Sequence, residues 1–323
     1  MNILVFGKDG QLGKAFQSIF NTKKLDELHA IDYAGREQCD LSHELDLAAF
    51  LHHRKPDLII NAAAYTAVDR AESEVDLAFA INAKAPAVMA RYAAKEGATF
   101  LHYSTDYVFD GSKATPYVES DTRNPLGVYG KSKAAGEEAI EDAFRDNHNP
   151  YAQFAIFRTS WVYGDGGNFI RTILRLAKER ETLKVIANQY GVPTSATWLA
   201  NISLDLLLDE ANQLRVLPSG VYHAVPQGET TWHAVASYAV QVAIDTGVLL
   251  KLRPDQIEAI PASDYPLPAP RPMNSRMARL ALDTTLGNAL KSSGDVTKLQ
   301  QWQQSWEESV ETYVRNLALH KLI

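Results

Sequence analysis

The sequence predicts an α/β protein in which helices cover both faces of a doubly wound parallel sheet, with a smaller mixed domain after it. In the first half of the chain, short β-branched or aromatic runs alternate with longer stretches whose apolar residues recur at three- and four-residue spacing. This alternation is typical of βαβ units, in which a helix connects two parallel strands. A length of 323 residues further suggests about two folding units with a large buried core.

The expected elements follow one another along the first half of the chain. Strands are expected at residues 3–6, 58–62, 100–104 and 154–158. Helices are expected at residues 12–20, 45–53, 75–96 and 129–144. Because crossovers between parallel strands are right-handed, these helices are expected to pack back onto the sheet.

The pattern loosens from about residue 168. Strand-like and helix-like pieces there alternate with turns that contain proline. The proline-rich segment from Pro261 to Pro272 is excluded as a central helix or strand, because proline removes a hydrogen-bond donor. Beyond it, residues 296–319 carry three aromatic residues at helical spacing, which predicts a single closing amphipathic helix.

Composition excludes several classes of protein. The balance of 32 basic against 39 acidic residues, a formal net charge of -7, argues against a general nucleic-acid binder and against binding to anionic membranes. No stretch approaches the roughly 18 apolar residues of a membrane helix, and the first ten residues are expected to form a strand rather than a signal peptide. The single cysteine, Cys39, excludes an intrachain disulfide and favours a reducing, cytoplasmic location.

Three glycines follow the first expected strand at fixed spacing. Gly7, Gly10 and Gly13 form G-x-x-G-x-x-G where a helix is expected to begin. Such a turn lets the backbone approach a pyrophosphate, and the amino end of the helix presents free N–H groups and a positive dipole. The strand, turn and helix therefore predict a Rossmann-like dinucleotide site. A tight glycine turn without a ligand is the alternative.

Residues farther along extend this cofactor site. Asp32, about 20 residues after the last motif glycine, is placed to bond the adenosine ribose hydroxyls of NAD, although an ordinary turn aspartate is the alternative. Arg36 nearby would offset the repulsion between that carboxylate and a 2′-phosphate, so NADPH and NADH both stay open. Asp40 and Leu41 are expected to flank the adenine. The small residues at 61–64 would let a cofactor lie against the backbone.

A second pattern, Y-x-x-x-K at Tyr129 and Lys133, predicts the reacting groups. One helical turn separates the two residues, so their side chains share one helix face. Tyrosine has a pKa of about 10, and a nearby ammonium lowers it, which suits the proton donor of a carbonyl reductase. The spacing alone is weak, but Thr105 ends a preceding strand and brings a hydroxyl to the same edge of the sheet. Trp161 is expected to line a ligand cleft or pack in the core, and Arg271 is a candidate anion clamp.

Missing motifs exclude other chemistries. Pro125 stands where a phosphate-binding P-loop needs glycine, and the sequence has no G-x-S-x-G hydrolase elbow. The nine histidines show no H-E-x-x-H or comparable spacing, so no metal site is expected. His102, His223 and His233 are interpreted as structural or surface residues.

Five sequence blocks together resemble the extended short-chain dehydrogenase/reductase family. They are the glycine turn, N-A-A-A at 61–64, S-T-D-Y-V-F at 104–109, Y-G-K-S-K at 129–133 and R-T-S-W-V-Y at 158–163. The similarity extends to Q-Y-G-V-P-T at 189–194 and R-P at 271–272, and so covers nearly the full length. The resemblance implies a Rossmann-like NAD(P)-binding domain at 1–167, to which about 183–225 partly return, and a domain mainly for a nucleotide-sugar substrate at 168–323.

The resemblance also implies a reaction, the reduction of the 4-keto group of dTDP-4-dehydro-L-rhamnose by NADPH or NADH, giving dTDP-L-rhamnose for cell-surface polysaccharide. Tyr129 would donate the proton to the carbonyl oxygen, Lys133 would lower the pKa of Tyr129 and bind the nicotinamide ribose, and Thr105 would hydrogen-bond the carbonyl. Asp106 and Trp161 would lie near the sugar. The cofactor would be held by Gly7, Gly10, Gln11, Leu12, Gly13, Asp32, Asp40, Leu41, Ala62, Ala63, Ala64, Tyr65, Tyr129 and Lys133.

Metal use and assembly distinguish this chain from some members of that family. Some are magnesium-dependent dimers that use glutamates, one of them just after the glycine turn. Lys14 and Ala15 stand there in this chain, which argues against a metal-bridged dimer. A homodimer without metal stays open. Two alternative functions also remain: an epimerase or dehydratase of the same fold, which keeps its NAD tightly bound, and a non-enzymatic regulatory subunit like that of methionine adenosyltransferase.

Overall fold

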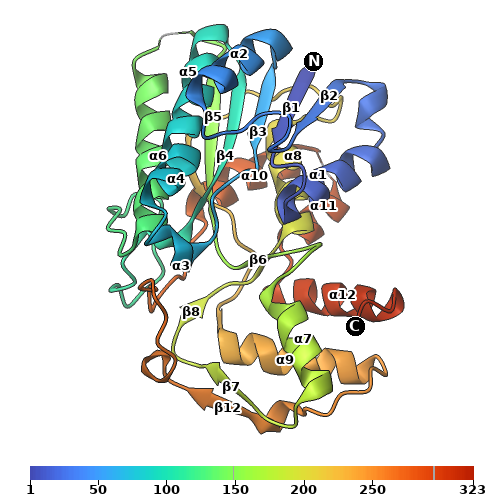
Figure 1. The fold of residues 1–323 in the computed structure, drawn as a ribbon. Helices are drawn as coiled ribbons and strands as arrows, with labels where there is room; N and C mark the ends of the chain where they lie inside the picture. The colour runs from blue at the N-terminus through green and yellow to red at the C-terminus, as the bar shows by residue number, and fades with distance from the viewer. Residues whose placement is uncertain (148, 294) are drawn as a thin grey trace.

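The computed structural model describes residues 1–147, 149–293 and 295–323. Within these residues, six parallel strands form one sheet in the order β10-β5-β4-β3-β1-β2 (Figure 1). They are β1 (Asn2–Phe6), β2 (Ala30–Ala34), β3 (Leu58–Asn61), β4 (Thr99–Thr105), β5 (Gln153–Thr159) and β10 (Gly220–His223). The order reverses between β1 and β3, and ligands bind outside the carboxyl ends of strands at such a point. The predicted doubly wound α/β fold is confirmed.

Helices cover both faces of this sheet, because successive strand residues point to opposite sides. Ile3 and Val5 of β1 face the core formed with α1, α8 and α10, whereas Leu4 and Phe6 face the core formed with α2, α5 and α6. These helices are α1 (Gln11–Thr22), α2 (Glu44–Arg54), α5 (Ala85–Glu96), α6 (Val128–Arg145), α8 (Ala196–Leu207) and α10 (Leu280–Ser293). Elements α8, β10 and α10 come from the second half of the chain, which therefore supplies part of the sheet and its cover.

Apart from α11, which packs on α8 and α10, the other elements of the second half lie below the sheet as a smaller mixed unit (Figure 1). Its core is formed mainly by three helices, α7 (Phe169–Glu179), α9 (Trp232–Asp245) and α12 (Trp306–Leu319). Short strands pair around them, β6 with β9 and β7 with β12 in parallel and β8 with β11 antiparallel. These strands are β6 (Val162–Tyr163), β7 (Leu183–Ile186), β8 (Tyr190–Gly191), β9 (Thr194–Ser195), β11 (Thr230–Thr231) and β12 (Ile257–Ile260).

Two helices differ from the prediction. The helix expected at 75–96 consists of α4 (Val75–Phe79), a π-helical turn η2 (Ala80–Lys84) and α5 in direct succession. The single helix expected at 296–319 is wrong, because the chain forms α11 (Val296–Trp302) and then α12. The break occurs where Ser305 caps α12: its hydroxyl accepts from the Glu308 N–H, and the Glu308 carboxylate accepts from the Ser305 N–H.

Short helical turns complete the fold. They are η1 (Leu25–Glu27), α3 (Val68–Ala71), η3 (Asp106–Val108), η4 (Pro254–Gln256) and η5 (Ala262–Asp264). Between residues 261 and 272, η5 is followed by irregular chain, which confirms that this segment is neither a central helix nor a strand. In the part of the chain that the structure describes, no helix is both long enough and apolar enough to span a bilayer.

Candidate active site

The glycine turn lies at the switch point of the sheet, between the carboxyl end of β1 and the amino end of α1. Gly7 has a φ of 83°, and a Cβ there would lie 2.7 Å from the Ala63 nitrogen. A Cβ on Gly13 would lie 2.1 Å from the Gly7 carbonyl oxygen. Gly10 occupies the N-cap of α1 without a side-chain cap. The turn therefore presents bare backbone and the positive end of a helix, which suits a pyrophosphate.

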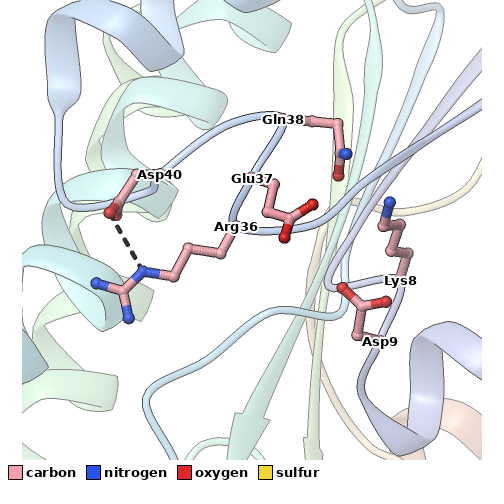
Figure 2. Close-up of a pocket in the computed structure, with 6 residues that line it drawn as sticks. All are labelled: Lys8, Asp9, Arg36, Glu37, Gln38 and Asp40. Atoms are coloured by element: carbon pink, nitrogen blue, oxygen red, sulfur yellow. Dashed lines mark hydrogen bonds and ion pairs between the residues drawn. The ribbon is translucent and has the colours of Figure 1, made fainter.

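An open cleft of about 620 Å³ adjoins this turn (Figure 2). It is lined by Lys8, Asp9, Arg36, Glu37, Gln38 and Asp40. Arg36 donates from Nε to Asp40 at 3.3 Å. Hydrogen bonds from the Ser42 backbone and hydroxyl lower the pKa of Asp40, and Arg36 adds to that effect. The cleft thus brings two cations, Lys8 and Arg36, and three carboxylates to the edge of the sheet where the adenosine half of a dinucleotide is expected.

Asp32 and Leu41, two residues expected near the adenosine, both have contacts within the chain. Strand β2 continues to Ala34, so Asp32 lies inside the strand, where its carboxylate pairs with Arg54 at 3.1 Å. Leu41 is buried in the core on the α2 side of the sheet. Sequence reasoning missed two of the cleft residues, Lys8 and Asp9. Their position directly after the first motif glycine could have indicated that they line the cofactor site.

Strand β4 and helix α6 bring the predicted reacting groups to the same edge. Thr105 is the last residue of β4, and Tyr129 and Lys133 lie one turn apart near the start of α6. Helix α6 packs closely on the loop after β4, because a Cβ on Gly130 would lie 2.2 Å from the Tyr107 carbonyl oxygen. Burial raises the pKa of Tyr129 to about 12, although a hydrogen bond with Thr105 opposes the shift. Tyr129 is therefore a neutral phenol, and the lowering of its pKa that was expected from Lys133 does not outweigh the effect of burial.

Lys133 is anchored beneath the site rather than exposed to solvent. Its amine donates to the Tyr103 carbonyl at 2.5 Å and lies 3.1 Å from Nε2 of His102. Burial lowers the pKa of Lys133 to about 8, while the nearby Glu137 carboxylate opposes that shift. His102, expected to be a structural or surface residue, is fully buried and lies against this lysine. The signal in the sequence was a lone imidazole within the apolar run of β4.

A buried ion-pair cluster supports α6 one turn farther along. Glu137 accepts hydrogen bonds from Arg158 of β5, the shortest at 2.6 Å, and from Arg123 at 2.7 Å. The side chains of Glu137 and Arg158 are at most 1% exposed. Burial raises the pKa of Glu137, but the two guanidinium groups outweigh it and hold the pKa below its usual value. Sequence reasoning missed this cluster, which fixes the helix that carries Tyr129 and Lys133.

The predicted substrate residues lie between the sheet and the smaller unit. Asp106 is buried after β4, and burial raises its pKa to about 6 against hydrogen bonds with Ser275 and Thr105. Trp161 has a left-handed backbone, with a φ of 48°, and its ring stacks on Trp232 at 3.7 Å between centroids. The aromatic stack makes a flat apolar wall at the end of β5.

Arg271, the candidate anion clamp, is engaged within the chain. Both of its terminal nitrogens donate to the Asp69 carboxylate at 2.9 Å. Asp69 also accepts from the Ala269 N–H at 3.1 Å. These bonds join the proline-rich segment to α3, so Arg271 holds these two parts of the chain together. Its role as an anion clamp stays a prediction.

The residues present fit a dinucleotide but not a magnesium ion. The glycine turn leaves no room for side chains, and beside it the Gln11 Oε1 atom is buried without a hydrogen-bond partner among the described residues. Both features suit a bound pyrophosphate and ribose. At the place of the expected metal ligand, Lys14 pairs with Asp165 at 3.8 Å. The described residues contain no group of three or more His, Cys, Asp or Glu side chains that could hold a metal.

Residues 1–315 match the family model described as RmlD substrate binding domain. The chain belongs to this family. A relative from Salmonella typhimurium named dTDP-4-dehydrorhamnose reductase is 45% identical over 279 residues, which cover 86% of this chain and 89% of the relative. A dTDP-4-dehydrorhamnose reductase structure from Clostridium acetobutylicum has a TM-score of 0.80 and 33% identity, covering 98% of this chain and 99% of that one.

A second solved structure of that name, from Bacillus anthracis in complex with NADP, has a TM-score of 0.79 and 30% identity and covers 97% of this chain and 98% of that one. The likeness to RmlD-family proteins therefore extends over both the sheet and the smaller unit. It does not depend on the glycine turn alone, which many nucleotide-binding proteins share.

Proposed function

We propose that the chain is an NAD(P)H-dependent dTDP-4-dehydrorhamnose reductase, which converts dTDP-4-dehydro-β-L-rhamnose to dTDP-L-rhamnose. One observation carries the proposal: at the carboxyl end of β4, Thr105 hydrogen-bonds Tyr129, and Lys133 lies one helical turn from Tyr129 on α6, at the same edge of the sheet as the glycine turn. The relatives named dTDP-4-dehydrorhamnose reductase support the choice of substrate.

The reduced nicotinamide supplies a hydride when it is bound. We assign its pyrophosphate to the glycine turn and the amino end of α1, at Gly10, Gln11 and Leu12. Helix dipole and free N–H groups attract the diphosphate there, although the chain as a whole carries a net charge of -7. Segment 62–65 and the cleft beside Arg36 would hold the rest of the cofactor. Lys8 and Arg36 would attract a 2′-phosphate, but Asp9, Glu37 and Asp40 line the same cleft, so NADPH and NADH both stay open.

The side chains around the sugar carbonyl then divide the chemistry. Tyr129 holds a proton on its phenol oxygen and gives it to the carbonyl oxygen as the hydride reaches carbon. Thr105 orients that oxygen with its hydroxyl. Lys133, as an ammonium, stabilises the phenolate that remains. Asp106 and Trp161 are assigned to the sugar, the first by hydrogen bonding and the second by contact with its flat ring.

Replacing Tyr129 with phenylalanine tests this assignment. We expect kcat to fall by about 100- to 10,000-fold, because the general acid is lost, while NADPH still binds. Loss of NADPH absorbance measures the first effect, and fluorescence titration measures the second. Tyr151→Phe, at a residue 80% exposed, is the matched control. Retained turnover in Tyr129→Phe would remove Tyr129 from the role of proton donor.

The same assay separates the alternative functions. An epimerase or dehydratase returns its nicotinamide unchanged at the end of each cycle, so NADPH oxidation would not match the sugar consumed. A regulatory subunit would give no oxidation that depends on a ketosugar. We therefore expect one NADPH oxidised for each dTDP-4-dehydrorhamnose reduced, and absence of turnover by the unmodified chain would refute the proposed function.

Organisation and location follow as lesser proposals. We divide the chain into a dinucleotide-binding unit around the sheet and a nucleotide-sugar unit below it, with α8, β10 and α10 assigned to the first. Packing of these elements on the sheet supports this division. A cytoplasmic location is supported by Cys39, a free and buried thiol. A homodimer stays part of the proposal, but not one bridged by magnesium.

A further inference from the structure

A buried chain of hydrogen bonds lies beneath Lys133. Asn61 ends β3, and His102 is its direct partner in the parallel register of β3 and β4. Both side chains are fully buried. Nδ2 of Asn61 lies 3.0 Å from Nδ1 of His102, and Nε2 of His102 lies 3.1 Å from the Lys133 amine. Three polar side chains are thus joined in a row between the sheet and α6.

The backbone of the proposed cofactor segment orients the first member of this row. The Ala63 N–H donates to Oδ1 of Asn61 at 3.2 Å, which leaves the amide NH₂ facing His102. A neutral imidazole has one N–H and one acceptor nitrogen. When Nδ1 accepts from Asn61, Nε2 carries the hydrogen and faces Lys133 as a donor. Such a donor pairs with a neutral amine and not with an ammonium.

An ammonium at Lys133 needs the opposite arrangement. All its N–H groups are donors, so Nε2 of His102 must accept and the imidazole hydrogen must sit on Nδ1. That N–H requires an acceptor, which Asn61 supplies only by turning its amide and giving up the bond from Ala63. The ammonium form of Lys133 and the Ala63–Asn61 hydrogen bond therefore compete.

We propose that Asn61 and His102 are positioning residues that couple the charge of Lys133 to the backbone of segment 62–65. The inference rests on the proposed function in so far as that segment and Lys133 serve one cofactor. A cofactor that draws the Ala63 N–H away from Asn61 frees the amide to turn. The ammonium form of Lys133, which the reaction uses, is then favoured when the cofactor is in place. The arrangement with the Ala63–Asn61 bond and the arrangement with the turned amide differ by one proton on Lys133.

The surrounding charges allow this exchange near neutral pH. Burial, and then the charge of Lys133, hold the pKa of His102 well below its usual value, so the imidazole stays neutral and changes only its tautomer. Burial brings the pKa of Lys133 to about 8. The other titratable groups around the lysine are Tyr129 and Glu137 of α6 and, paired with Glu137, Arg158 of β5 and Arg123 of the loop before α6. The two arginines balance much of the Glu137 charge. The hydrogen bond with His102 therefore decides whether Lys133 is an ammonium or a neutral amine.

The tautomer of His102 is directly measurable without turnover. Nitrogen-15 NMR of histidine-labelled enzyme reports which ring nitrogen carries the hydrogen, and the His102→Gln variant assigns the resonance. We expect the hydrogen to move from Nδ1 to Nε2 with a midpoint near pH 8, where Lys133 loses its proton, and we expect added NADPH to raise that midpoint. A tautomer that stays the same across the titration of Lys133 would overturn the proposal, whether or not the enzyme turns over ketosugar.

A charge substitution at Asn61 gives an independent kinetic test. In Asn61→Asp the carboxylate accepts from Nδ1–H and cannot donate, which fixes the tautomer that suits an ammonium. We expect the basic limb of the pH profile of kcat/KM to move up by about one unit or more. Gln153→Glu is the matched control, because this buried residue starts β5, about 13 Å along the sheet from the lysine anchor. An unshifted limb in Asn61→Asp, or equal shifts in both variants, would contradict the coupling.

Discussion

Replacing Glu137 with glutamine is expected to destabilise the fold strongly, although the residue lies outside the substrate site. Its carboxylate binds Arg158 and Arg123, and Glu137 and Arg158 are both buried from solvent. Glutamine keeps the shape but leaves the buried Arg158 guanidinium without a compensating charge, whereas Arg123 keeps its ion pair with Glu141. Breaking a buried pair by removing one partner costs about 3–5 kcal/mol. At about 2–4 °C of melting temperature per kcal/mol in a large domain, we expect a fall of roughly 6–20 °C.

Thermal unfolding followed by circular dichroism measures this effect. Glu138→Gln is the matched control, since Glu138 is its neighbour, its side chain is 62% exposed, and it lies 3.7 Å from the same Arg123. An exposed pair contributes at most about 1 kcal/mol. A fall in melting temperature for Glu137→Gln no larger than for Glu138→Gln would refute the reasoning, because the buried pair would then stabilise no more than a surface pair.

The pH dependence of that difference has a definite sign. The folded-state pKa of Glu137 is below its usual value of 4.5, since the arginines outweigh burial. A group with a depressed folded pKa contributes stability above its unfolded pKa and loses it as pH falls through the folded pKa. The stability gap between the unmodified chain and Glu137→Gln should therefore persist at neutral pH and shrink below pH 4.5. A gap that widens in acid would contradict the ion-pair account.

Two further predictions concern the glycine turn and Asp106. A Cβ on Gly13 would lie 2.1 Å from a backbone oxygen, so Gly13→Ala should weaken NADPH binding by about tenfold or more by fluorescence titration, whereas Gly220→Ala, with open space around it, should not. Asp106 has a pKa raised to about 6 by burial, so its stabilising contribution is present in acid and lost as pH rises through 6. The melting temperature of Asp106→Asn should exceed that of the unmodified chain at pH 8, and this difference should disappear near pH 4. An equal difference in melting temperature at both pH values would contradict the burial account.

The sequence by itself determined the features that local spacing controls. The glycines at 7, 10 and 13 define a turn within one strand–helix junction, and Tyr129 and Lys133 share a face because four residues make about one helical turn. The capping box at Ser305 and Glu308 belongs to the same class, because S-x-x-E is readable in the sequence. Missing it produced the wrong single helix at 296–319.

Only the tertiary structure decided which distant groups meet those residues. His102 lies under Lys133 because the register of β3 and β4 sets Asn61 opposite His102 on the face that α6 covers. Glu137 meets Arg158 for a similar reason, since β5 and α6 pack across a layer. Strand register and helix packing depend on contacts among residues tens of positions apart, which no local spacing encodes. The sequence therefore determined which groups are the candidates for the chemistry, and the packing of α6 on the sheet decided which side chains surround its lysine.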